Sequence, residues 1–242
     1  MVCGPFVIAV NNLNILSLKT IVMKLVTWNM QGSNHSTENK WNTGVMNFFS
    51  NGADICCLQE CGAVPQSALI VYENYCGIAN LQYWTWGAER ALKYILFYPA
   101  DPNGNRCNLA IVSRTEPISG TTVQPGAAPI WRPALGFQYN ATHFIFSLHA
   151  ISPGGPDVVG LLAAINAFAG NPGQTWDAAG DFNREPGSFG TAFTVCPPDA
   201  DTYSVNNPNK KIDYAVKING AVTIGFVQGP ILSDHYSVAY EF

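Results

Sequence analysis

The stretch Lys24–Ser33, KLVTWNMQGS, decides the fold, because it reads as a buried strand that ends abruptly in polar groups. Three further segments have the same form: LQECG at Leu58–Gly62, AGDFNREP at Ala179–Pro186 and LSDHYSV at Leu232–Val238. The polar groups at these strand ends are Asn29, Glu60, Asp181, Asn183, Asp234 and His235. A buried carboxylate is costly unless something pairs with it, so the pattern predicts an oxygen-rich cation site with a histidine beside it.

Apolar periodicity predicts an α/β fold with strand and helix units at both ends of the chain and hairpins between them. The first strand covers Lys24–Trp28, and apolar residues at helical spacing from Trp41 to Phe49 predict the helix that follows. A second helix covers Val158–Phe168 and stops near Gly170. The other predicted strands are Asp54–Leu58, Tyr94–Tyr98, Leu109–Ser113, Ala134–Gln138, His143–His149, Trp176–Gly180, Ile212–Lys217, Val222–Val227 and Ser237–Phe242. Two sheets packed face to face with helices outside fit this order.

Length and composition favour one domain over residues 23–242 of the 242. Residues 1–22 are apolar but interrupted by asparagines, and their only basic residue is Lys19. We interpret them as an appended extension or a degenerate leader. No stretch is predicted to span a bilayer.

The charge of the chain gives no global attraction to nucleic acid, since the net charge is −4 and only 12% of residues are charged. All five arginines lie between residues 90 and 184. They are either ordinary surface residues or a local phosphate-binding patch on an acidic protein. The seven cysteines include no CxxC pair, which argues against a zinc site.

Hydrolysis of a phosphoester needs a cation, an activated water and a stabilised leaving oxygen. Glu60 is the best single candidate for a Mg²⁺ ligand. Asp181 and Asn183 are two residues apart, so in an extended segment both point to one face. Of the four histidines, His149 ends an apolar strand and His235 follows Asp234, whereas His35 and His143 are better explained as structural or exposed.

The order WN, QE, GDxN and SDH resembles the endonuclease/exonuclease/phosphatase superfamily, whose best-known fold is that of pancreatic-type deoxyribonuclease. A closer resemblance, over about Met23 to Phe242, is to the catalytic subunits of cytolethal distending toxins. The motifs that carry it are KLVTWNMQGS, KWN, NRCNLAIVSR, WRP, GDFNREP, KIDYAV and SDHYSV.

This resemblance implies a deoxyribonuclease I-like four-layer α/β sandwich, with two mostly antiparallel sheets flanked by helices. It also implies DNA cleavage with Mg²⁺, or with Ca²⁺ or Mn²⁺ in its place. The implied metal ligands are Glu60, Asn29 and Asp234. The implied catalytic residues are the pair His149 and His235, Asp213 orienting His235, and Asp181 and Asn183 positioning water and phosphate. The implied phosphate or DNA contacts are Arg106 and Arg132.

Three functions remain open on the sequence alone. The leading one is a genotoxin endonuclease, a secreted effector acting in the nucleus of a target cell, with DNA as substrate and with delivery subunits or fusion partners. The second is a phosphoinositide phosphatase that uses the same site. The third is a non-catalytic homologue, which the intact site residues argue against. The sequence gives no clear match for the acidic partner that the resemblance implies beside His149, and Glu73 and Glu89 are only candidates for it.

Overall fold

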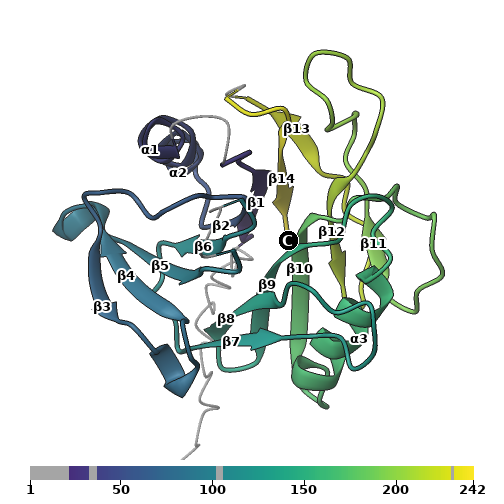
Figure 1. Ribbon diagram of the computed structural model, residues 1–242, viewed down its shortest axis with the longest axis horizontal. Helices are drawn as coiled ribbons and strands as arrows, with labels where there is room; N and C mark the ends of the chain where they lie inside the picture. The colour runs from purple at the N-terminus through teal and green to yellow at the C-terminus, as the bar shows by residue number, and fades with distance from the viewer. Residues whose placement is uncertain (1–21, 33–36, 102–105, 230–231) are drawn as a thin grey trace, which may run out of the picture.

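The computed structural model describes residues 22–32, 37–101, 106–229 and 232–242. Two sheets face each other, and helices lie on their outer faces (Figure 1). The predicted extension at residues 1–22 lies outside the described residues, apart from Val22, and so does His35. The single-domain boundary at residue 23 therefore stays a prediction.

Within the described residues, the larger sheet has eight strands in the order β13-β14-β1-β2-β6-β5-β4-β3. Its strands are β1 (Lys24–Asn29), β2 (Ile55–Gln59), β3 (Leu69–Tyr72), β4 (Gln82–Trp86), β5 (Lys93–Tyr98), β6 (Leu109–Ser113), β13 (Phe226–Gln228) and β14 (Ser237–Glu241). The smaller sheet of this part of the chain has six strands in the order β11-β12-β10-β9-β8-β7. Its strands are β7 (Ser119–Val123), β8 (Ala134–Asn140), β9 (His143–His149), β10 (Thr175–Asp181), β11 (Thr194–Cys196) and β12 (Asp213–Lys217).

Helical segments cover both sheets from outside. Two short 3-10 turns, η2 (Tyr75–Gly77) and η3 (Glu89–Ala91), lie in the connections from β3 to β4 and from β4 to β5. The first helical layer consists of α1 (Thr37–Asn39), the π-helical η1 (Lys40–Val45) and α2 (Met46–Ser50). This layer packs apolar side chains, such as those of Trp41 and Phe48, against β1 and β2. The second layer is α3 (Val158–Ala169), whose apolar face packs against β9 and β10. The predicted four-layer sandwich is confirmed.

Alternation along the strands sends every second side chain into the space between the sheets. In β1, Leu25 belongs to the core shared by the two sheets, whereas Val26 and Trp28 pack against the helical layer. In β10, Ala179 belongs to the shared core, whereas Ala178 packs on the side of α3. The same parity turns Asn29 and Asp181, at the ends of these two strands, toward each other.

Most strand pairs are antiparallel, as predicted, but β1–β2 and β9–β10 are parallel. The carboxyl ends of parallel strands meet at one edge, where ligands of α/β sheets usually bind. In this fold that edge carries Asn29, Gln59, His149 and Asp181.

Two aspects of the strand prediction are wrong. The strand predicted over Val222–Val227 starts at Phe226 and ends at Gln228. Four strands, β3, β4, β7 and β11, were not predicted at all. In the described ranges no helix is long and apolar enough to cross a bilayer.

Candidate active site

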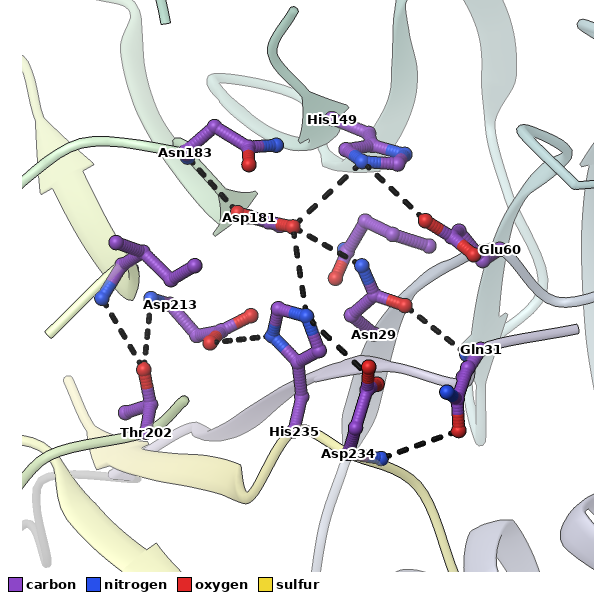
Figure 2. Close-up of polar contacts among 12 residues, drawn as sticks. Asn29, Gln31, Glu60, His149, Asp181, Asn183, Thr202, Asp213, Asp234 and His235 are labelled. Carbon is purple, nitrogen blue, oxygen red and sulfur yellow. Dashed lines mark hydrogen bonds and ion pairs between the residues drawn. The ribbon is translucent and has the colours of Figure 1, made fainter. Parts of the chain in front are cut away.

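The side chains predicted from the strand ends converge on a cavity of about 350 Å³ at this edge of the two sheets (Figure 2). Both sheets contribute to its lining, which includes Glu60, His149, Asp181, Asn183, Asp234 and His235. Asn29 and Asp213 are buried and bonded to residues that line it. The structure thus brings together these eight predicted residues from six separate segments.

Asp181 lies at the centre of the site and is held by bonds to both of its carboxylate oxygens. The Asn29 side-chain amide donates to Oδ2 at 3.0 Å, and the Asn183 backbone N–H donates to Oδ1 at 2.8 Å. Burial raises the pKa of this carboxyl to about 7, and the nearby Asp213 carboxylate also raises it. A carboxylate that titrates near neutral pH can exchange protons with water during a reaction.

His235 is buried and is oriented by Asp213. Its Nδ1 lies 2.9 Å from Asp213 Oδ2, so Nδ1–H donates to this carboxylate and Nε2 points toward Asp181 and Asp234, 3.9 Å from each. Burial alone would lower the pKa of His235, but Asp213 and the other two carboxylates raise it to about 10. This ring carries a positive charge at neutral pH.

His149 has the opposite surroundings. Arg132 is buried, and its guanidinium donates to His149 Nδ1 at 2.9 Å and to the Ala150 carbonyl at 2.7 Å. Nδ1 is therefore the acceptor, and the proton lies on Nε2, which faces Asp181 Oδ2 at 3.5 Å and Glu60 Oε1 at 3.7 Å. Burial and then the Arg132 charge hold the pKa of His149 well below its usual value.

Glu60 follows β2 in a left-handed backbone conformation, with φ of 46°. Burial raises the pKa of its carboxyl, and the negative charge of Asp234 raises it further. The neighbouring loop approaches so closely that a Cβ at Gly32 would lie 2.3 Å from the Glu60 carbonyl oxygen. Only glycine at position 32 therefore lets the loop after β1 lie against Glu60.

Two groups of side chains could hold a cation. Among the described residues, Asp181, Asp213 and His235 form a group of two acids and an imidazole, with one ligand atom of each within 4.8 Å of the others. However, Asp213 Oδ2 already accepts from His235, and Asp181 Oδ2 already accepts from Asn29. Glu60, Asp234 and Asn29 offer only oxygen atoms, which suit a hard cation such as Mg²⁺ better than imidazole does, although Asn29 Oδ1 also accepts one hydrogen bond, from the Gln31 N–H.

Several residues that shape the site were not predicted. Gln31 donates its backbone N–H to Asn29 Oδ1 at 3.0 Å, and its side-chain oxygen accepts from the Asp234 N–H at 3.3 Å (Figure 2). The buried Lys40 donates to the carbonyls of Met30 and Gln31. Burial lowers the pKa of Lys40 to about 8, although Asp234 and Glu60 oppose this effect. Only the KWN motif signalled this lysine.

The remaining predictions concern residues at the rim of the site or away from it. Arg106 is exposed and lines the cavity. His143 lies at the other end of β9 from His149 and pairs with Asp177 at 3.1 Å, as expected of a structural histidine. Glu73 and Glu89 are exposed. Among the described residues, the carboxylates paired with His149 are those of Glu60 and Asp181, and neither candidate, Glu73 nor Glu89, is among them.

A sequence model of the endonuclease/exonuclease/phosphatase family matches residues 26–235, which include every residue of this site. The chain belongs to this family. Membership makes it a hydrolase of the nuclease and phosphodiesterase type. Members of this family generally use a divalent metal.

Sequence comparison places it near toxin subunits within the family. It is 33% identical to a homolog of the cytolethal distending toxin component CdtB from Salmonella typhi, over 90% of this chain and 88% of that protein. The CdtB of Escherichia coli is 29% identical, over 89% of this chain and 90% of that one. The resemblance seen in the motifs is confirmed.

Structural comparison agrees with this placement. The crystal structure of the Haemophilus ducreyi cytolethal distending toxin matches with a TM-score of 0.80 and 28% identity, covering 90% of this chain and 97% of the solved one. The toxin from Actinobacillus actinomycetemcomitans matches with a TM-score of 0.78 at the same identity and coverage.

Proposed function

We propose that this protein is a divalent-metal-dependent DNA endonuclease and the catalytic subunit of a toxin similar to cytolethal distending toxin. The observation that carries the proposal is the hydrogen-bonded set Asp213–His235 and Asn29–Asp181–Asn183 beside Glu60, at the cavity edge of this fold. The toxin subunits it resembles support delivery as a secreted effector that works with further subunits.

Glu60, Asp234 and Asn29 would hold the metal, because they provide oxygen donors and two carboxylates whose mutual repulsion a cation relieves. Once bound, Mg²⁺ would offset negative charge on the scissile phosphate. The alternative group of Asp181, Asp213 and His235 includes an imidazole, so Mg²⁺ should prefer the three residues that offer oxygen.

The protein's own residues would then act on the water and the phosphate. Asp181 accepts the proton of the attacking water while Asn183 helps to position it, and the new bond forms between that water oxygen and phosphorus. The bond from phosphorus to the leaving oxygen breaks. Protonated His235, oriented by Asp213, donates from Nε2 to the phosphate or its leaving oxygen.

His149 would act as a neutral hydrogen-bond donor through Nε2, since Arg132 occupies Nδ1. Arg106 would contact a phosphate at the rim. Arg132 as a phosphate contact stays a prediction, and its bonds to His149 and Ala150 point to a positioning role.

The deciding experiment is nicking of supercoiled plasmid by the purified protein with Mg²⁺, with and without EDTA. We expect nicked circles only with Mg²⁺, and loss of nicking in His149→Ala. The matched control is His143→Ala, which changes the same residue type at the other end of the same strand and should keep activity. Hydrolysis of a soluble phosphoinositide without plasmid nicking would instead identify the phosphatase, and activity on neither substrate would contradict the proposal.

A further inference from the structure

A short hairpin over residues 202–211 forms one wall of the cavity, although no sequence motif covers residues 202–210. The Tyr203 and Lys210 backbones bond to each other in both directions, at 3.1 and 3.0 Å. The hairpin is also tied to the segment around His235: Tyr236 N–H donates to the Thr202 carbonyl at 2.8 Å, and Val205 N–H donates to the Asp234 carbonyl at 3.0 Å. Its position relative to His235 is therefore fixed.

Thr202 connects the same hairpin to the histidine's carboxylate partner. Its hydroxyl oxygen accepts from the backbone N–H groups of Ile212 and Asp213, both at 3.1 Å (Figure 2). This residue is buried, so the bonds are shielded from water. Tyr203 and Lys210 therefore belong to a rigid part of the site and not to a free surface loop.

The side chains of Tyr203 and Lys210 line the cavity without a function in the site described above. The Tyr203 ring lies against the His235 ring, with centroids 4.7 Å apart, and is partly exposed. The Lys210 ammonium lies 5.6 Å from the centre of the Tyr203 ring and is exposed. Among the described residues, no carboxylate lies within ion-pair distance of this lysine.

The cavity is lined by several carboxylates, so a lysine there without a carboxylate partner among the described residues, Lys210, is a candidate to bind an anionic substrate. Carboxylates of Glu60, Asp181 and Asp234 line the cavity and would repel a polyanion. Arg106 lines the cavity together with Glu60 and His149, and its charge lowers the pKa of both, whereas Lys210 lies with Tyr203 beside His235. A polymer with regularly spaced phosphates could meet one cation on each side of the reacting phosphate.

We propose that Lys210 and Tyr203 form a subsite for the nucleotide that adjoins the scissile phosphate. The Lys210 ammonium binds the phosphate of that nucleotide, and the Tyr203 ring contacts its sugar or base, since aromatic rings stack on nucleotides without regard to sequence. The inference rests on the proposed DNA hydrolysis. It adds that Lys210 and Tyr203 help the site to bind a polynucleotide and contribute little to the binding of an isolated phosphodiester.

The test compares two substrates, supercoiled plasmid and bis(4-nitrophenyl) phosphate, which has no neighbouring nucleotide. Lys210→Ala should lower plasmid nicking about tenfold more than it lowers hydrolysis of the small diester, within the range measured for one base–aromatic or phosphate contact. It should also reduce the salt dependence of nicking by about one unit of log–log slope. Tyr203→Leu should lower the plasmid-to-diester ratio, and Tyr203→Phe should retain it.

The matched control is Lys217→Ala. Lys217 also lies over an aromatic ring, that of Phe242 at 4.8 Å, but at the end of β12 away from Asp213. Lys217→Ala removes the same charge as Lys210→Ala and should keep the wild-type ratio of plasmid nicking to diester hydrolysis.

Three outcomes would overturn the subsite. They are an equal loss on both substrates in Lys210→Ala, an equal change of the ratio in Lys217→Ala, and a loss confined to a soluble phosphoinositide. Failure of the wild-type protein on plasmid and diester alike would overturn the proposed function, and the subsite with it.

Discussion

Replacing Asp213 by Asn removes the carboxylate that holds His235 without changing the size of the side chain. Asp213 Oδ2 accepts from His235 Nδ1 at 2.9 Å, and its other oxygen is buried without a hydrogen-bond partner in the described structure. The variant should therefore lower the pKa of His235 toward the value that burial favours. In the metal-free protein this change has a measurable consequence for stability.

The sign and size follow from the shift of the His235 pKa from 6.5 to about 10. A raised pKa stabilises the folded protein fully below the unfolded value, and this stabilisation is lost as the pH rises toward 10. One pKa unit corresponds to about 1.4 kcal/mol. The wild-type free energy of unfolding should thus fall by on the order of 3 kcal/mol between pH 7 and pH 9 through this group, and most of that fall should disappear in Asp213→Asn.

The measurement is urea denaturation followed by tryptophan fluorescence at pH 7 and pH 9, in EDTA, for wild type and variant. The histidine C–H signals in NMR would report the same pKa change directly. Asp177→Asn is the matched control, because it removes the carboxylate beside His143 and does not touch His235. If wild type and Asp213→Asn lose equal stability between the two pH values, the assignment of His235 as a charged ring is wrong.

Three further expectations concern activity. Glu60→Gln keeps the shape of the side chain but removes its charge, so Mg²⁺ affinity measured by calorimetry and the nicking rate should both fall. A folded variant with unchanged Mg²⁺ affinity and nicking rate would exclude Glu60 as a ligand. His149→Ala and His235→Ala should each lower turnover by ~10²-fold or more, while the double variant loses far less than the product, as single-turnover rates would show. Arg106→Ala should weaken nicking and flatten its salt dependence by about one log–log unit, and parallel slopes at equal rates would make Arg106 an ordinary surface residue.

The fold was predictable wherever a strand was both buried and ended in a motif. The strand at Leu109–Ser113 was predicted with its observed bounds, because all five of its residues are buried and apolar or small. The edge strand β3 was missed because all four of its residues are exposed, so no alternation of burial marks it. β11 is only three residues long, and its pairing with β12 depends on contacts distant in sequence.

Most residues of the candidate site could be named from the sequence, but their hydrogen-bond partners and pKa shifts could not. Motifs at strand ends identified Asn29, Glu60 and Asp181, because strand parity and parallel pairing bring them to one edge. Tyr203 and Lys210 gave no signal, since their position depends on a hairpin whose bonds run to the segment around His235. Gln31 was likewise overlooked, although it lies inside the first motif, two residues after β1, and links Asn29 to Asp234.

The two histidines show why environment matters more than residue type. Both Nε2 atoms face the same oxygen, Asp181 Oδ2, at 3.5 Å from His149 and 3.9 Å from His235. Asp213 behind His235 favours the charged ring, whereas Arg132 behind His149 opposes it. Different protonation of two like groups beside one carboxylate is the condition for dividing acid and donor roles between them. We therefore expect Arg132, which the sequence suggested only as a phosphate contact, to act in the proposed reaction through the histidine that it contacts.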